Sequence, residues 1–248
     1  MAAEALKVSN VKKQFGALAA IDGVTLSVKQ GERRAIIGPN GAGKTTFFNL
    51  VSGALSLTAG TIELNGTNVT SIPSWKRVRL GLSRTFQRNN LFLSLSVYEN
   101  VQLAVQREMG TSYNMLRPAR SFGDVRAKIL DILDKVGLAD RGDIEVANLS
   151  YGEQRQVEVA LALASEPKIL LLDEPTAGMS LTETRRMIDL IKKLPSDLTL
   201  MIVEHDMEVV FAISDYITVL HLGQVLTEGT PSEVQADQRV REVYLGEE

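Results

Sequence analysis

The stretch that decides the fold is Ile37-Gly38-Pro39-Asn40-Gly41-Ala42-Gly43-Lys44-Thr45, which matches the pattern G-x-x-x-x-G-K-[ST]. An apolar run at 34–37 leads into it, and residues 45–51 after it have a helical pattern. Glycines let the backbone turn tightly, so that successive N–H groups point inward at phosphate oxygens, and the following helix adds its positive end. This order of strand, loop and helix predicts a phosphate-binding loop.

Two side chains of this loop have a predicted chemical role. We expect Lys44 to reach the β- and γ-phosphates of a nucleotide and the Thr45 hydroxyl to ligate Mg²⁺. The other loop residues expected at the nucleotide are Gly38, Asn40, Gly41, Gly43 and Thr46. The competing interpretation is a glycine-rich turn that matches the pattern by chance, and the strand–loop–helix context argues against it.

The composition is that of an ordinary soluble globular protein. The chain has 248 residues, of which 44% are hydrophobic and 23% charged, and its net charge of −3 gives no reason to expect non-specific nucleic-acid binding. The absence of cysteine excludes disulfides and thiolate metal sites. We see no signal peptide, and the apolar runs are too short to span a bilayer. We therefore expect a cytoplasmic protein whose role at a membrane depends on a partner.

Hydrophobic patterning divides the chain into three parts. Strand and turn signals come first, helical periodicity follows, and continuous apolar runs typical of buried parallel strands return at 169–172 and 198–203. A helical pattern at 181–194 lies between these runs, so the order implies a doubly wound sheet. The remaining expected elements are strands at 24–28 and 61–64, helices around 97–105 and 129–136, and a hairpin of 216–221 and 224–227.

These signals predict an α/β fold, in which a P-loop NTPase core with a mostly parallel sheet carries an antiparallel β subdomain and an inserted helical subdomain. We expect a single domain over 1–248. Residues 1–87 and 165–222 would form the nucleotide-binding core and the β subdomain, 88–164 the helical subdomain, and 223–248 a C-terminal hairpin strand and tail.

Two adjacent carboxylates, Asp173 and Glu174, follow the expected strand at 169–172. In open α/β folds, ligands bind at the carboxyl edge of the sheet. We expect Asp173 to hold the Mg²⁺, directly or through water, and Glu174 to polarise an attacking water as a general base. An apolar run followed by Asp-Glu is often only a strand end, and the phosphate-binding loop is what favours the catalytic interpretation.

Two further polar side chains are expected at this edge. His205 follows the strand at 198–203 and is placed to hydrogen-bond the γ-phosphate, although a single His after a strand is usually a surface residue. Gln87 lies where the strand region gives way to the helical insert, within reach of the Mg²⁺ or the attacking water. The catalytic candidates are therefore Glu174, His205 and Gln87, and the metal candidates are Thr45, Gln87 and Asp173.

The segment Leu149-Ser150-Tyr151-Gly152-Glu153-Gln154-Arg155 begins a predicted helix. Ser150 and Glu153 have the spacing of a capping box, which would explain the segment by itself. The alternative is that this helix start binds phosphate through Ser150, Gly152 and Glu153. Because the segment belongs to the helical insert, it would serve a nucleotide held by a second copy, giving a two-fold dimer with two shared sites.

With these motifs in this order, the chain resembles the ATP-binding subunits of ABC transporters over nearly its whole length. In that family Gly38–Thr45 corresponds to the Walker A loop and Lys168–Glu174 to the Walker B strand. Gln87 corresponds to the Q-loop residue, Leu149–Gln154 to the signature and His205 to the switch histidine.

In finer detail the chain is similar to the branched-chain amino-acid uptake group, at 84–92, 96–101, 203–207 and 229–231. Phe15 matches the aromatic that stacks on adenine in the family, whereas taken alone it reads as a core residue. The resemblance implies ATP and Mg²⁺ as cofactors and ATP hydrolysis coupled to transport. It also implies a second ATP-binding subunit, identical or paralogous, transmembrane permease subunits, indirectly a substrate-binding protein, and no nucleic acid. The protein would lie at the inner face of the cell membrane.

The chain departs from the family pattern at two places. The common Leu-Ser-Gly-Gly-Gln appears as Leu149–Glu153, with Ser150 and Gly152, the phosphate-facing pair, retained. Where the family usually has Leu-Asp after the Walker B strand, this chain has Met179-Ser180. That loop normally links the two sites of the dimer, so the missing carboxylate puts tight coupling between them in doubt.

Three other functions compete with amino-acid uptake. One is an ABC ATPase of a lipid or lipopolysaccharide export system, which the sequence leaves open. A non-transport ABC ATPase acting on DNA or ribosomes is disfavoured because the chain has no coiled coil, zinc module or second ATPase half. A P-loop GTPase or small-molecule kinase is disfavoured because no Asn-Lys-x-Asp motif occurs and neither class explains the segment Leu149–Gln154.

Overall fold

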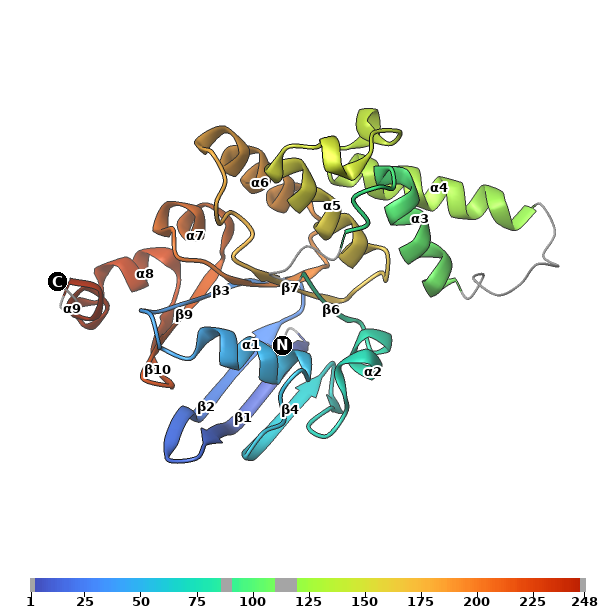
Figure 1. The fold of residues 1–248 in the computed structure, drawn as a ribbon. Helices are drawn as coiled ribbons and strands as arrows, with labels where there is room; N and C mark the ends of the chain where they lie inside the picture. The colour runs from blue at the N-terminus through green and yellow to red at the C-terminus, as the bar shows by residue number, and fades with distance from the viewer. Residues whose placement is uncertain (1–2, 86–90, 110–119, 246–248) are drawn as a thin grey trace. The chain divides into compact units, whose positions relative to one another are not determined.

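The computed structural model describes residues 3–85, 91–109 and 120–245, so the predicted site residue Gln87 lies outside the described residues. The chain divides into two compact units (Figure 1). The first consists of Met1–Arg84, Lys168–Pro175 and Pro195–Glu248, and the second of Thr85–Pro167 and Thr176–Leu194. The segment 176–194 thus belongs to the second unit, whereas the predicted division placed it in the core.

A six-stranded sheet in the order β10-β9-β3-β8-β7-β6 forms the centre of the first unit. Its strands are β3 (Arg33–Ile37), β6 (Leu82–Arg84), β7 (Ile169–Asp173), β8 (Thr199–Val203), β9 (Tyr216–His221) and β10 (Gln224–Gly229). All neighbours are parallel except β9 and β10, which form the predicted hairpin. Every residue of β7 and β8 is buried, which explains their unbroken apolar sequences. The mostly parallel sheet is confirmed.

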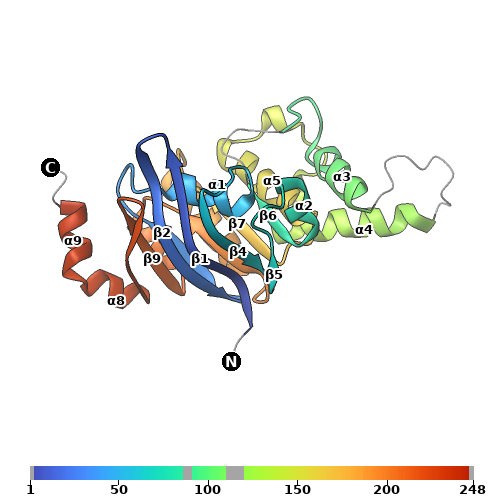
Figure 2. The same ribbon diagram turned by 90° about the horizontal axis from the view of Figure 1, so that it is seen from below.

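A second sheet in the first unit is antiparallel, as predicted, with the order β2-β1-β4-β5. Its strands are β1 (Glu4–Phe15), β2 (Leu18–Lys29), β4 (Ala59–Leu64) and β5 (Thr67–Asn68), and Figure 2 shows β2, β1 and β4 as one layer. Helix α1 (Lys44–Ser52) contributes Phe47 and Phe48 to a core that contains residues of both sheets. This core fixes where α1 begins relative to the strands.

Short helices pack on the other face of the parallel sheet. They are α7 (Met207–Ile213), α8 (Pro231–Ala236) and α9 (Gln238–Leu245). A further short helix of this unit, α2 (Ser74–Arg79), directly precedes β6 in the chain. Successive side chains of a strand point to opposite faces. Accordingly Ile36 packs into the core with α1, whereas Ala35 and Ile37 pack with Val210 and Val234. The sheet is therefore covered on both faces.

The second unit is helical in its described residues, with α3 (Val97–Glu108), α4 (Arg120–Lys135), α5 (Tyr151–Leu163) and α6 (Leu181–Lys193). Short 3₁₀ turns η1 (Ala139–Arg141) and η2 (Val146–Asn148) connect α4 to α5. Capping boxes start three of the helices, at Ser96 for α3, Ser150 for α5 and Ser180 for α6. The predicted inserted helical subdomain is confirmed.

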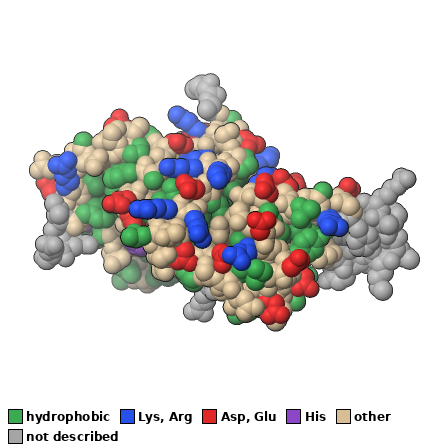
Figure 3. Space-filling view, turned by 90° about the horizontal axis from the view of Figure 1, so that it is seen from above, with side chains coloured by type: hydrophobic (Ala, Val, Ile, Leu, Met, Phe, Trp, Pro, Cys, Tyr) green, Lys and Arg blue, Asp and Glu red, His purple; other side chains and the backbone are tan. Residues whose placement is uncertain are grey.

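Charges on the surface are mixed. Figure 3 shows Lys and Arg side chains interspersed with Asp and Glu over the visible described surface, as expected for a chain with a net charge of −3. Within the part of the chain that the structure describes, no helix is both long enough and apolar enough to span a membrane.

Candidate active site

The phosphate-binding loop connects β3 to α1 in a conformation that requires glycine. Gly38 has φ 149°, and a Cβ there would collide with the carbonyl of Leu220. Gly43 has φ 102°, and a Cβ there would lie 2.7 Å from the carbonyl oxygen of Ala20. Residues that carry a side chain rarely adopt these backbone angles. The glycines of the motif therefore allow the loop to pass close to neighbouring backbone.

Lys44 begins α1 and is buried within the loop. Its Nζ donates to the carbonyl oxygen of Pro39 at 2.9 Å and to that of Gly38. Thr45 and Thr46 follow in the first turn, where backbone N–H groups have no intrahelical partner. The N-cap of α1 is Gly43, so no side chain caps this helix start. Asn40, Gly41 and Thr45 are exposed, which leaves the loop open to a ligand.

Asp173 ends β7 at the carboxyl edge of the sheet and is 1% exposed. Its Oδ2 forms an ion pair with Nη2 of Arg84 at 2.6 Å. The Nη1 of Arg84 also donates to Oδ1 of Asn49 at 2.6 Å and to Oγ of Ser52 at 3.3 Å. Arg84 therefore connects the buried carboxylate to α1, the helix that carries Lys44.

Our sequence analysis missed Arg84. The available signal was that two neighbouring parallel strands, β6 and β7, end in Arg and Asp respectively. Their pairing was not recognised because 82–84 is too short to stand out as a strand.

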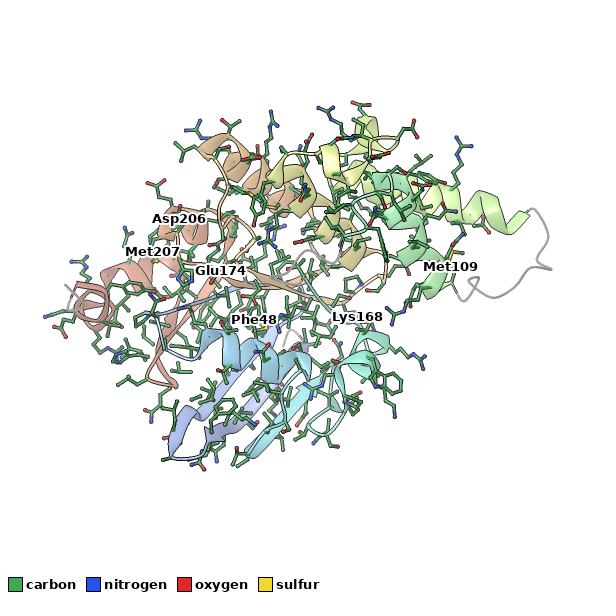
Figure 4. All side chains as sticks on the ribbon, viewed as in Figure 1. Phe48, Met109, Lys168, Glu174, Asp206 and Met207 are labelled. Atoms are coloured by element: carbon green, nitrogen blue, oxygen red, sulfur yellow. The ribbon has the colours of Figure 1, made fainter. Side chains whose placement is uncertain are left out.

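Glu174 and His205 form a hydrogen-bonded pair, with Oε1 and Nε2 2.6 Å apart. Glu174 has φ 47°, a left-handed conformation that is uncommon and strained for residues other than glycine. Its N–H donates to the carbonyl oxygen of Val203 at 2.9 Å, which ties the end of β7 to the end of β8. Figure 4 labels Glu174 near the start of α7, marked by Asp206 and Met207. The sequence analysis predicted both residues at this edge independently, and the structure shows that they contact each other directly.

Phe15 ends β1 and is 47% exposed, with Nζ of Lys13 5.0 Å from the centroid of its ring. An exposed ring is not a core aromatic, so the alternative interpretation of this residue is wrong. An exposed aromatic ring is suited to stacking against a planar ring such as a nucleotide base.

The predicted phosphate-facing segment starts α5 in the second unit. The Ser150 hydroxyl accepts from the N–H of Glu153 at 3.3 Å, and Oε2 of Glu153 accepts from the N–H of Ser150 at 2.9 Å. The capping interpretation is therefore confirmed, and phosphate binding remains a prediction. The N–H of Gly152 donates to Oε1 of Glu183 at 3.0 Å. Glu183, in α6, is a second residue that our sequence analysis missed, although Ser180-x-x-Glu183 is itself a capping-box pattern.

The residues present fit a magnesium ion that also binds a nucleotide. Thr45 and Asp173 offer a hydroxyl and a carboxylate, the hard oxygen ligands that Mg²⁺ prefers, and substrate phosphates commonly complete such a site. Among the described residues no group of three or more His, Asp or Glu side chains forms a metal cage. The donor set therefore suits a metal that arrives with its nucleotide.

Comparison with known proteins gives consistent matches. Residues 21–177 match a family model described as ABC transporter, and residues 224–248 match one described as branched-chain amino acid ATP-binding cassette transporter. The chain is 37% identical over 249 aligned positions to the high-affinity branched-chain amino acid transport ATP-binding protein LivG of Salmonella typhimurium, covering 98% of each chain.

Solved structures are similar as well. One is a nucleotide-free ATP-binding cassette from an ABC transporter, with a TM-score of 0.84, 28% identity, and coverage of 98% of this chain and 100% of that one. Another is a dimeric ATP-binding cassette in a post-hydrolysis state bound to ADP and Pi. It has a TM-score of 0.75, 26% identity, and coverage of 91% and 98%.

Proposed function

This chain belongs to the ABC transporter family as an ATP-binding, ATP-hydrolysing subunit, and we propose that its transporter takes up branched-chain or related amino acids. The name of the similar LivG protein and the family model matched at 224–248 both refer to branched-chain amino acids. The single observation that carries the catalytic part is the Glu174–His205 pair, held at the sheet edge where β7 also presents Asp173.

Each catalytic, metal-binding or nucleotide-binding candidate has a role in the proposed reaction. Lys44 binds the β- and γ-phosphates of ATP, Thr45 and Asp173 hold Mg²⁺, and Glu174 accepts a proton from the attacking water. The ion supplies charge neutralisation at the phosphates. His205 keeps the Glu174 carboxylate in place and contacts the γ-phosphate. For Gln87 and Phe15 we retain the proposed contacts with the metal or water and with adenine.

We further propose that Ser150 and Gly152 bind the γ-phosphate of ATP held by a second ATP-binding subunit, identical or paralogous, with Glu153 next to them. Hydrolysis removes a ligand that favours the closed dimer, and such differential affinity is what a conformational switch requires. The dimeric state of one similar cassette supports this arrangement. The ATP-binding subunits would open and close at the cytoplasmic face of the membrane and so drive the transmembrane permease subunits. A substrate-binding protein would deliver the amino acid to these permease subunits.

Amino-acid uptake in cells tests the proposed substrate. In a strain lacking the gene, we expect uptake of radiolabelled leucine, isoleucine and valine to fall. The wild-type chain should restore it and the Glu174→Gln variant should not. Uptake of glutamate by the same cells is the control for general energy loss. Normal branched-chain uptake together with altered membrane lipid composition would instead support the export alternative.

We expect Arg84→Met to raise the Mg²⁺ concentration needed for half-maximal ATPase activity. Arg84 orients the Asp173 carboxylate, and losing a partner of a metal ligand typically costs about 10- to 100-fold in metal affinity. Titration of Mg²⁺ at saturating ATP measures the effect. Arg84→Lys should lose less because it keeps the charge, and the exposed Arg107→Met is the matched control. An unchanged Mg²⁺ dependence would limit Arg84 to a structural role.

A further inference from the structure

Glu183 connects the starts of two helices in the second unit. Its Oε2 accepts from the N–H of Ser180 at 3.0 Å and from the Ser180 hydroxyl at 2.8 Å, which caps α6. Its Oε1 accepts from the N–H of Gly152 at 3.0 Å, in the first turn of α5. Hydrogen bonds from Ser180 and then Gly152 lower the pKa of Glu183 to about 2, so the side chain is anionic at neutral pH.

Capping α6 does not by itself require the contact with Gly152. In the corresponding capping boxes of α3 and α8, the carboxylates of Glu99 and Glu233 accept from their own N-cap residues, Ser96 and Thr230. Glu183 does this for Ser180 and in addition reaches a neighbouring helix. The extra contact places a negative charge at the positive end of α5, where an anion is stabilised.

The carboxylate lies directly against the residue proposed to receive phosphate. Ser150, Gly152 and Glu183 line one small recess, and a Cβ built on Gly152 would lie 2.9 Å from Oε1 of Glu183. A phosphate oxygen accepting from the N–H of Gly152 would have to take the position that Oε1 occupies. Two anions cannot share that position, because like charges at such a distance repel strongly.

We propose that Glu183 is an internal anion that occupies the phosphate-binding start of α5 and is displaced by the γ-phosphate when the two ATP-binding subunits close. This inference rests on the proposed role of Ser150 and Gly152. Glu183 then sets the ATP concentration at which closure occurs, and it is a positioning residue that takes no part in the chemical step. Because Ser180 holds the other carboxylate oxygen, Glu183 can release Gly152 and still cap α6.

The role also gives a reason for one departure from the family pattern. Ser180 stands where the family usually has an aspartate, and it begins α6 as its N-cap. Its capping box fixes the carboxylate of Glu183 within reach of Gly152. Ser180 thus replaces the usual aspartate, and through its capping box it positions the carboxylate of Glu183 at the start of α5.

The test compares Glu183→Gln with the unmodified residue in chains that also carry Glu174→Gln, whose slow hydrolysis lets an ATP-bound dimer accumulate. Glutamine is accepted at this position of a capping box, so α6 keeps its cap while the charge is lost. We expect the Mg-ATP concentration for half-maximal dimer, measured by analytical ultracentrifugation, to fall about three- to tenfold, because a neutral acceptor binds an N–H about half as strongly as a charged one. In chains with Glu174, the KM for ATP should fall similarly with little change in kcat.

Glu233→Gln is the matched control, since it makes the same change in the capping box of α8 and should leave the ATP dependence unchanged. Glu183→Asp provides a second variant that shortens the side chain away from Gly152 and keeps its charge, and it too should lower the half-maximal ATP concentration. If the Glu174→Gln chain dimerises with ATP and Glu183→Gln leaves the midpoint unchanged or raises it, the inference is wrong and the proposed function stands. If ATP produces no dimer at all, both fail.

Discussion

Replacing Glu174 with glutamine should lower ATP turnover about 100- to 10,000-fold, the usual contribution of a general base. The amide has nearly the shape of the carboxylate but cannot accept the proton of the attacking water. Lys44 and Thr45 are untouched, so ATP binding should persist. Phosphate release measures turnover, and equilibrium binding of a fluorescent ATP analogue measures affinity.

The same variant should accumulate as a dimer in Mg-ATP, because the γ-phosphate is no longer removed. Glu208→Gln is a suitable control, since Glu208 is exposed in the first turn of α7 and lies outside the proposed site. Turnover that stays at the wild-type level in Glu174→Gln would remove Glu174 from the role of base. The Glu174–His205 hydrogen bond would then need a different explanation.

Much of the fold was predictable because its signals are local in the sequence. The runs at β7 and β8 are apolar throughout because both faces of each strand are buried, and the glycines at 38 and 43 have no alternative in the loop geometry. The glycine-rich loop and the two adjacent carboxylates at the end of β7 were recognised because they too are local patterns. The loop is a short pattern that can be interpreted by itself, and it in turn favoured the catalytic interpretation of the two carboxylates.

The helical pattern was less exact. The helices expected around 97–105 and 129–136 include Leu103 and Leu130, which the helical pattern would place on the buried face, yet they are 45% and 47% exposed. Leu103 lies two residues from both Val101 and Val105, and residues two apart face different sides of a helix. Helix α4 begins at Arg120, well before the apolar residues that marked it in the sequence.

Contacts between distant segments could not be predicted. Arg84 and Asp173 are far apart in the chain, and their ion pair depends on β6 pairing with β7. The contact of Glu183 with Gly152 likewise depends on how α5 packs against α6. From the sequence, Ser180 was notable only because the family usually has an aspartate there. In the fold, Ser180 is the N-cap of α6.

Replacing Arg77 with methionine should lower the free energy of unfolding by about 3–5 kcal/mol, because buried acceptors that lose their partner cost about 1–3 kcal/mol each. Arg77 lies in α2 and is 2% exposed. Its Nη1 donates to the carbonyl oxygens of Leu50 and Val51 at 2.8 and 2.7 Å, and its Nε to that of Ile72 at 2.8 Å. Two of these carbonyls belong to the last turn of α1, and that of Leu50 also accepts from the N–H of Gly53 at 3.2 Å.

Burial lowers the pKa of Arg77 only to about 10, so the guanidinium stays charged at neutral pH and its hydrogen bonds are charge-assisted. The side chain also packs against Gly53, where a Cβ would lie 2.7 Å from Nε. Methionine fills part of this space but donates no hydrogen bond. The exposed Arg79→Met, on the same helix, is the control and should change stability by less than about 0.5 kcal/mol.

Urea unfolding of the two variants, followed by circular dichroism, gives the free energies. The effect should also reach the site, because the end of α1 is held by Arg77 and its start carries Lys44. We therefore expect saturating Mg-ATP to recover part of the lost stability of Arg77→Met, since a ligand that binds only the folded state stabilises it. Equal stability of the two variants would mean that water replaces the guanidinium at the end of α1.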